Sequence, residues 1–160
     1  MASSGASAEA LPFFVYGTLL PGYGNHDRTI RGRLDRVERG VRLPGARIYH
    51  YEYGFPGMVR ARPSDDSSHL GVVTGALLYA PADEYLAVLA DCDRLEGFTS
   101  PGAEGNMYER EIVEVLLPSG AFTRAWTYFS LVDNAAATPV PSGDWHAFMQ
   151  SNRHLQEADN

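Results

Sequence analysis

Short apolar runs bounded by glycine and proline predict a chain built mainly of strands. Residues 13–16 are aromatic and β-branched, and the run stops at Gly17. Runs of this kind between turn residues are typical of buried strands. Further strands are expected at residues 46–51, 70–80, 107–117 and 121–129. Residues 55–59 are expected to form a turn that leads into another strand. Glycines inside residues 70–80 indicate a bulge or the close approach of another backbone segment.

One longer segment, residues 81–97, has the pattern of a helix. It begins at Pro81 or the next residue, two acidic residues follow in the expected first turn, and Gly97 comes directly after its end. A shorter helix is expected at residues 145–152, capped near Ser142.

The remaining segments give less information. Residues 21–25 and 133–141 have loop composition, and the charged residues 27–40 give no clear prediction. Strands dominate, with one clear helix between them. The fold class is therefore expected to be α+β, a small mixed-sheet β-barrel with flanking helices.

A carboxylate falls on the apolar face of the predicted long helix. At ~100° per residue, Glu96 lies on the same side as Tyr85, Leu89 and Cys92. Burial penalises the charged form, so an inward-facing glutamate should have a raised pKa suited to general acid–base catalysis. The simpler interpretation is that Glu96, at the helix end, turns to water or pairs with an arginine. Asp93, at the edge of the same face, is the second candidate.

The turn after the first strand is a candidate anion site. Gly17 can adopt backbone conformations closed to other residues, so consecutive N–H groups can converge on one point. Such donors suit a carboxylate or a developing oxyanion. The simpler interpretation is an ordinary strand-to-loop turn. No glycine–lysine pair follows, and Gly17, Gly22 and Gly24 lack the spacing of a dinucleotide-binding loop.

Composition narrows the classes of function. The chain has 160 residues and a net charge of −7, so we expect one domain, residues 11–152, that does not bind nucleic acid. No apolar run approaches the ~18 residues of a membrane span, so no membrane partner is expected. All 13 basic residues are arginine, which excludes lysine chemistry. Residues 1–10 lack the features of a signal peptide and are expected to form a disordered tail, and residues 153–160 are expected to form a C-terminal tail.

Cysteine and histidine usage adds three expectations. Cys92 is the only cysteine, so no intrachain disulfide can form and a reducing cytoplasm is the expected location. On the apolar helix face, this thiol is expected to be inert core. The five histidines lack the paired spacing of metal ligands, so no metal is expected. The sequence leaves the oligomeric state open.

Several short motifs, taken in order, resemble the γ-glutamylcyclotransferase-like superfamily, which also includes plant avirulence-induced proteins. Residues 14–19 read Phe-Val-Tyr-Gly-Thr-Leu and are followed by Asn25 and His26, an opening that most resembles the γ-glutamylamine cyclotransferase branch. The later motifs are Phe55-Pro56, residues 73–79, Asp93-x-x-Glu96-Gly97, Tyr108-x-Arg110 and residues 125–128. The resemblance spans roughly residues 12–129.

This resemblance implies a cofactor-independent enzyme whose partner is a small-molecule γ-glutamyl substrate. The implied reaction is intramolecular aminolysis, which releases 5-oxoproline and a free amine. Glu96 takes the place of the family's catalytic glutamate and would serve as both base and acid. The implied substrate-binding residues, from the turn and the cavity wall, are Tyr16, Gly17, Thr18, Leu19, Tyr108 and Tyr128.

Alternatives stay open at this point. A chain can keep a fold and lose its activity, which would make this protein a non-catalytic small-molecule binding module. A third interpretation is an interaction domain in which Trp126, Trp145 and Phe148 form an exposed patch, although core packing is the more ordinary role for such residues. The leaving amine is not identified: amino acids, polyamines, lysine isopeptides and γ-glutamyl-protected natural-product intermediates remain candidates. The long loop at residues 97–107 bears on this specificity.

Overall fold

The computed structural model describes residues 10–52, 54–61, 71–132 and 136–152. The expected tails at residues 1–10 and 153–160 lie outside the described residues, except for Ala10. The elements in chain order are β1 (Phe13–Val15), α2 (Gly24–Thr29), β2 (Arg36–Pro44), β3 (Ala46–His50), β4 (Pro56–Arg60), β5 (Val72–Tyr79), α3 (Tyr85–Glu96), β6 (Tyr108–Leu116), β7 (Phe122–Ser130), β8 (Thr138–Pro139) and α4 (Trp145–Ser151).

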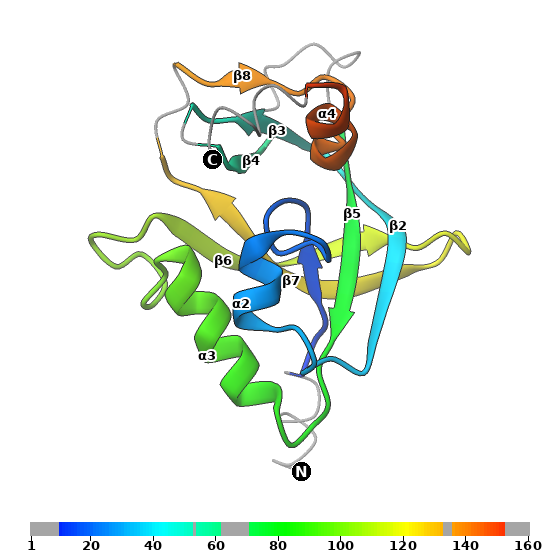
Figure 1. The fold of residues 1–160 in the computed structure, drawn as a ribbon, viewed down its shortest axis with the longest axis vertical. Coiled ribbons are helices and arrows are strands. Elements are labelled where there is room, and N and C mark those ends of the chain that lie inside the picture. The colour runs from blue at the N-terminus through cyan, green and yellow to red at the C-terminus, as the bar shows by residue number, and fades with distance from the viewer. Residues whose placement is uncertain (1–9, 53, 62–70, 133–135, 153–160) are drawn as a thin grey trace.

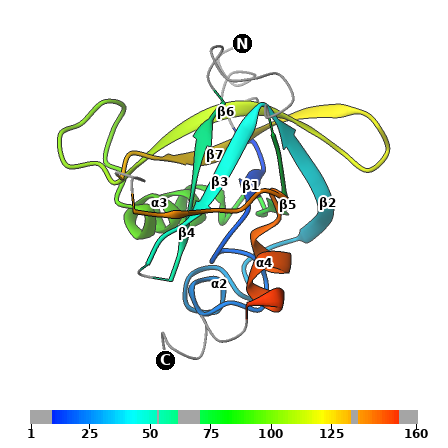
Figure 2. The ribbon, with the colours of Figure 1, turned by 90° about the horizontal axis from the view of Figure 1, so that it is seen from above.

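In the described part of the chain, five strands close into a barrel in the order β1-β5-β2-β6-β7. The barrel is mixed, because β1 pairs antiparallel with β5 and parallel with β7. A second sheet, β4-β3-β8, lies with α4 at one end of the barrel, and α2 and α3 lie side by side along its flank (Figures 1 and 2). The predicted mixed-sheet barrel with flanking helices is confirmed.

Two apolar clusters hold these parts together. The larger joins the barrel, the small sheet and α4 through residues that include Val115, Ala125, Ile48, Met58 and Trp145. The smaller packs α3 against β1 and β5 through residues that include Phe13, Val15, Leu78, Val88 and Cys92. Trp145 is 1% exposed and Phe148 and Trp126 are half-buried, so these aromatics pack against the core rather than form an exposed patch.

The strands predicted at residues 13–16, 46–51, 70–80, 107–117 and 121–129 are confirmed, but the turn expected at residues 55–59 is itself a strand, β4. One glycine has the expected purpose. An ideal Cβ on Gly75 would lie 2.1 Å from the carbonyl oxygen of Val15. Only a residue without a side chain lets β1 approach β5 this closely.

The charged segment at residues 27–40 overlaps two elements that the sequence did not predict, α2 and β2. α2 has only six residues and begins inside the expected loop at residues 21–25. β2 carries arginines on its outer face, while Val41 and Leu43 face the core. Its register shifts between Arg39 and Val41, so the strict alternation that identifies a strand is broken there.

Helix α3 begins at Tyr85, four residues after the expected start. Because the helix starts after Asp83 and Glu84, its first turn holds no acidic residue, and Glu84, the N-cap residue, makes no side-chain capping bond. The helix ends as predicted, with Gly97 in the left-handed conformation at φ 69°. Among the described residues, no helix is both long and apolar enough to cross a bilayer.

The C-terminal region differs in two details from its prediction. Asp144, not Ser142, caps α4, because its side chain accepts a hydrogen bond from the N–H of Ala147 at 3.0 Å. The short strand β8 lies within the expected loop at residues 133–141, of which residues 133–135 lie outside the described residues.

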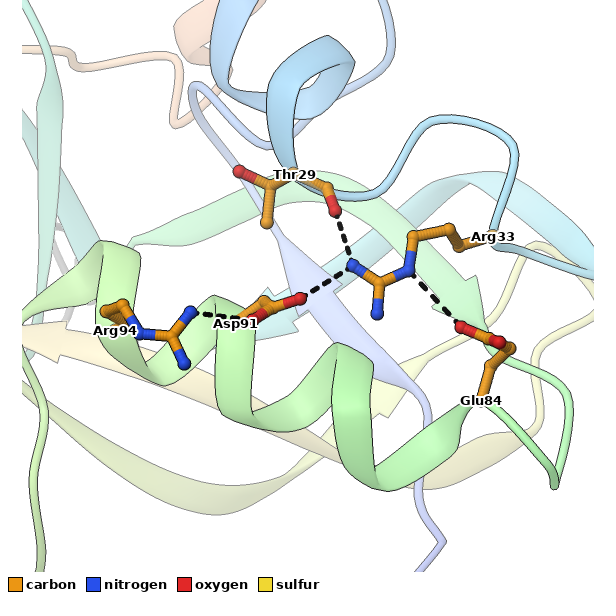
Figure 3. A network of polar contacts seen from close by, with 5 residues as sticks. All are labelled: Thr29, Arg33, Glu84, Asp91 and Arg94. Atoms are coloured by element: carbon orange, nitrogen blue, oxygen red, sulfur yellow. Dashed lines mark hydrogen bonds and ion pairs between the residues drawn. The ribbon is translucent and has the colours of Figure 1, made fainter.

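Arg33 connects the segment after α2 to α3 (Figure 3). Its guanidinium donates to the carbonyl oxygen of Thr29 at 2.9 Å and to Asp91 Oδ2 at 2.7 Å, and it contacts Glu84 Oε1 at 3.4 Å. Arg94, on α3 itself, donates to the other oxygen of Asp91 at 2.7 Å. These partly exposed contacts orient the two helices and contribute modestly to stability.

Candidate active site

The turn after β1 is tied to α2 by its carbonyl groups. The N–H of Leu20 closes the turn onto the carbonyl of Gly17 at 2.9 Å. The carbonyl of Thr18 accepts from the backbone N–H of His26 at 3.2 Å, and the carbonyl of Leu19 lies 2.8 Å from Nδ1 of the same residue. Among the described residues, the N–H groups of Thr18 and Leu19 donate no backbone hydrogen bond.

Gly17 is required for a different reason than expected. Its backbone is not in the positive-φ region, so conformational freedom is not what the position demands. An ideal Cβ on Gly17 would lie 2.3 Å from Cγ of Pro56. The turn therefore packs directly against the start of β4, with no room for a side chain between them.

A cleft of about 320 Å³, including its open mouth, lies beside this turn. Its walls bring together residues from β1, the turn, β4, the end of α3 and β7, namely Phe14, Val15, Tyr16, Gly17, Thr18, Leu19, Pro56, Glu96 and Tyr128. All but one of the residues implied by the resemblance thus meet at one cleft.

Tyr108 is the exception. It is buried, it does not line the cleft, and its hydroxyl donates to the carbonyl oxygen of Pro56 at 2.8 Å. It therefore supports the cleft indirectly, by holding Pro56, which lines the cleft.

Glu96 is the last residue of α3 and faces the cleft. Its carboxylate makes neither a hydrogen bond nor an ion pair with any of the described residues, so it does not pair with an arginine. Burial, and then the nearby charge of Asp93, raises the pKa of Glu96 to about 7. The flanks of the predicted apolar face are more exposed than expected, since Leu86 is 76% and Leu95 38% exposed.

Asp93, one turn earlier, has fixed partners. Its Oδ1 accepts from the hydroxyl of Tyr128 at 2.7 Å and forms an ion pair with Arg110 Nε at 2.9 Å. Burial raises the pKa of Asp93, while Tyr128 and Arg110 oppose that rise. The guanidinium of Arg110 also lies over the ring of Trp126, 4.2 Å from its centroid. Asp93 is thus occupied, whereas Glu96 is unpaired among the described residues.

The two tyrosines of the cleft wall have engaged hydroxyl groups. Tyr16 donates to the carbonyl oxygen of Tyr128 at 2.8 Å, and Tyr128 donates to Asp93. Burial raises the pKa values of both hydroxyls well above the usual range, so both remain protonated at neutral pH. They form a rigid, uncharged wall.

The structure adds residues of α2 that had no expected role. Asn25 donates from Nδ2 to the hydroxyl oxygen of Thr18 at 2.8 Å, and His26 is buried beneath the turn. The Asn25-His26 pair within the opening motif was the only sequence signal for them.

Other candidate chemistries find little support. Cys92 is buried, and burial raises its pKa to about 12, so it is a neutral thiol. Within the described ranges, no group of three histidine, cysteine or acidic side chains could hold a metal ion.

Comparison with solved structures shows the fold. YkqA from Bacillus subtilis is 20% identical over 90% of this chain, with a TM-score of 0.62, although the match covers only 42% of YkqA. The uncharacterised protein PH0828 from Pyrococcus horikoshii is 18% identical, with a TM-score of 0.56 and coverage of 90% of this chain and 97% of PH0828. An AIG2-like protein from Mus musculus is 19% identical, with a TM-score of 0.53 and coverage of 79% and 80%.

Sequence comparison gives the family. A search of curated proteins finds no match. The model of the family described as "Gamma-glutamyl cyclotransferase, AIG2-like" matches residues 13–147, a range that runs from β1 into α4. Since that match covers most of the chain, the protein belongs to the gamma-glutamyl cyclotransferase, AIG2-like family.

Proposed function

We propose that this protein is a γ-glutamylcyclotransferase that converts a γ-glutamyl amide into 5-oxoproline and a free amine, with Glu96 as the acid–base residue. One observation carries the proposal. A carboxylate with a pKa of about 7, unpaired among the described residues, faces the same cleft as a turn whose Thr18 and Leu19 N–H groups donate no backbone hydrogen bond within those residues. A group that titrates near neutrality can both accept and return a proton at working pH.

The reaction needs one proton carrier. The α-amino nitrogen of the substrate attacks its own γ-carbonyl carbon, and Glu96 accepts the proton that this nitrogen loses. The carbon–nitrogen bond to the leaving amine then breaks, and Glu96 returns the proton to the departing nitrogen. The five-membered lactam and the amine account for every atom of the substrate. Positioned acid–base catalysis of this kind contributes ~10²–10⁴ in rate.

The remaining cleft residues position the substrate. The N–H groups of Thr18 and Leu19 suit a carboxylate or the oxyanion on the γ-carbonyl. Tyr16 and Tyr128 hold the substrate in a folded shape, which favours ring closure. Asp93 is less suited to proton transfer because Tyr128 and Arg110 already occupy it.

The test compares the wild type with Glu96→Gln and Glu104→Gln. Glu104 is an exposed residue of the loop at 97–107 and serves as the matched control. Each protein is incubated with a panel of γ-glutamyl amino acids and γ-glutamyl amines, and 5-oxoproline is measured by mass spectrometry. We expect release by the wild type and Glu104→Gln, and a loss of about 100-fold or more in Glu96→Gln.

Two outcomes would contradict the proposal in different ways. Equal release by the wild type and Glu96→Gln would remove Glu96 from the chemistry and turn attention to Asp93. Binding of panel members without release by any variant would make the protein a non-catalytic binding module. The panel also identifies the class of leaving amine. A cytoplasmic location and independence from cofactors form part of this proposal.

A further inference from the structure

We propose that Asn25 is a positioning residue that directs the hydroxyl proton of Thr18 into the cleft, where it binds the carboxylate of the substrate. This inference rests on the proposed function and extends it, because it assigns the group of the substrate that the turn holds. It is based on the direction of two hydrogen bonds.

The donors and acceptors of this contact chain can be assigned. Arg28 Nη2 lies 2.5 Å from Oδ1 of Asn25, and Asn25 Nδ2 lies 2.8 Å from Oγ1 of Thr18. A guanidinium can only donate, so the carboxamide atom that faces Arg28 must be the oxygen. The NH₂ group of Asn25 then faces Thr18, and it too can only donate. Oγ1 of Thr18 therefore accepts, and its own proton must point elsewhere.

The cleft is the direction that the proposal gives to this proton. Thr18 lines the cleft, and its carbonyl is already bound to the backbone N–H of His26 on the side of α2. Each group in this chain thus donates to the next: the guanidinium of Arg28 to the carboxamide of Asn25, and the carboxamide to the hydroxyl of Thr18. In the proposal, the hydroxyl then donates into the cleft. Hydrogen bonds aligned in this manner polarise one another, which makes the last donor stronger.

The chain of donors suits a permanent anion. None of the described residues that line the cleft is basic, and the protein carries a net charge of −7. A substrate carboxylate in this cleft must therefore be held by dipoles, and a hydroxyl at the end of a chain that starts on a cation is such a dipole. The oxyanion on the γ-carbonyl is different, because it exists only during the reaction.

Two local features of α2 maintain this arrangement. An ideal Cβ on Gly24 would lie 2.9 Å from Nη1 of Arg28, so the glycine leaves room for the guanidinium over the start of the helix. His26 is buried, and because a carbonyl oxygen only accepts, its Nδ1 must carry the proton that faces Leu19. α2 thereby fixes both the side chain of Thr18 and the backbone that follows.

The test measures kcat and KM for the wild type, Asn25→Asp and Asn25→Ala with the γ-glutamyl amide that the wild type converts fastest. Asn25→Asp keeps the size of the side chain and the bond to Arg28, but it presents only oxygen to Thr18. The hydroxyl of Thr18 then donates to the new carboxylate and leaves the cleft. We expect KM to rise about tenfold or more with kcat within about twofold.

Asn25→Ala separates positioning from a structural role. It frees the hydroxyl of Thr18 to rotate, so we expect a smaller rise in KM than in Asn25→Asp. A merely structural role gives the reverse order, because alanine removes both hydrogen bonds whereas aspartate keeps one. Thr18→Ser should retain a KM near that of the wild type, and Thr18→Val should behave like Asn25→Asp.

Arg28→Gln and Arg31→Gln complete the set. Both residues are exposed and the change in charge is the same, but Arg28 contacts Asn25. We expect KM to rise about two- to threefold in Arg28→Gln, less so at 1 M salt, and to stay unchanged in Arg31→Gln.

The outcomes distinguish this inference from the proposed function. Release by the wild type with an unchanged KM in Asn25→Asp, or a fall in kcat in place of the rise in KM, overturns the inference alone. Absence of release by the wild type overturns the proposed function. In that case, calorimetry with the same γ-glutamyl amides still decides the inference, since Asn25→Asp must weaken the Kd about tenfold and more than Asn25→Ala does.

Discussion

At the residue scale, the ionised form of Glu96 destabilises the folded protein, because burial and a nearby charge raise its pKa. It ends α3 and faces the cleft without a partner among the described residues. Asp93, on the preceding turn, adds a like charge beside it. A group in this setting is retained at a cost in stability when it serves a reaction.

The cost can be measured as a dependence of stability on pH. The pKa of Glu96 is about 7 in the folded protein and 4.5 in the reference state, so the folded state holds the proton more tightly. The stability linked to this group is therefore fully present below about pH 4.5 and is lost as the pH rises through about 7. Glu96→Gln removes this loss. We expect the variant to gain up to about 3 kcal/mol over the wild type at pH 8, with much less gain at pH 5.

Urea denaturation of both proteins at the two pH values is the measurement, with Glu104→Gln as the control for loss of one exposed charge. A wild type that is as stable as Glu96→Gln at pH 8 would show that the carboxylate is not destabilised by its surroundings. Combined with the activity assay, the expected result is a variant that is more stable and less active.

At the element scale, the cleft depends on the contact between the turn after β1 and the start of β4. Gly17 and Pro56 meet there without an intervening side chain. Both also line the cleft, so their packing sets its width.

We expect Gly17→Ala to destabilise the protein by ~1–3 kcal/mol, because the new methyl group would collide with the Pro56 ring at 2.3 Å. Chemical denaturation measures this loss. The double variant Gly17→Ala, Pro56→Ala should recover part of it, since the alanine at position 56 lacks the atoms that collide. No recovery in the double variant would contradict the steric explanation.

The sequence predicts the elements that have a clear period and misses those that do not. β3, β5, β6, β7 and α3 follow regular patterns, and the helical spacing correctly turned Glu96 inward. α2 is too short for a period, and the bulge in β2 interrupts its alternation. The partners of Asp93 could not be predicted either, because Tyr128 lies 35 residues away and is brought close only by β7. The sequence identified Gly17 as important, but it could not reveal the contact with Pro56, because Pro56 lies in the other sheet.

At the scale of the whole molecule, one core joins the barrel, the small sheet and α4. The single domain expected at residues 11–152 stays a prediction, which cooperative unfolding would test. The two tryptophans probe separate parts of it, because Trp126 lies on β7 and Trp145 begins α4.

We expect the variants Trp126→Phe and Trp145→Phe, each with one remaining tryptophan, to show coincident fluorescence and circular-dichroism transitions in urea. A shared core couples the unfolding of its parts, so each probe should report the same midpoint as the secondary structure of its own variant. A tryptophan transition that precedes the loss of secondary structure would show that α4 or the barrel unfolds separately.

Closure of the barrel also determines when, in the order of the chain, the cleft can form. The cleft is made by residues 14–19, Pro56, Glu96 and Tyr128, and the ring closes only where β1 meets β7. Because β7 follows Glu96 in the chain, Tyr128 cannot enclose the carboxylate of Glu96 until β7 has been synthesised. Enclosure of that charge therefore depends on a long-range contact between the first strand and β7. A chain that ends before β7 carries the acid and the turn, but it has no enclosed site in which they can act together.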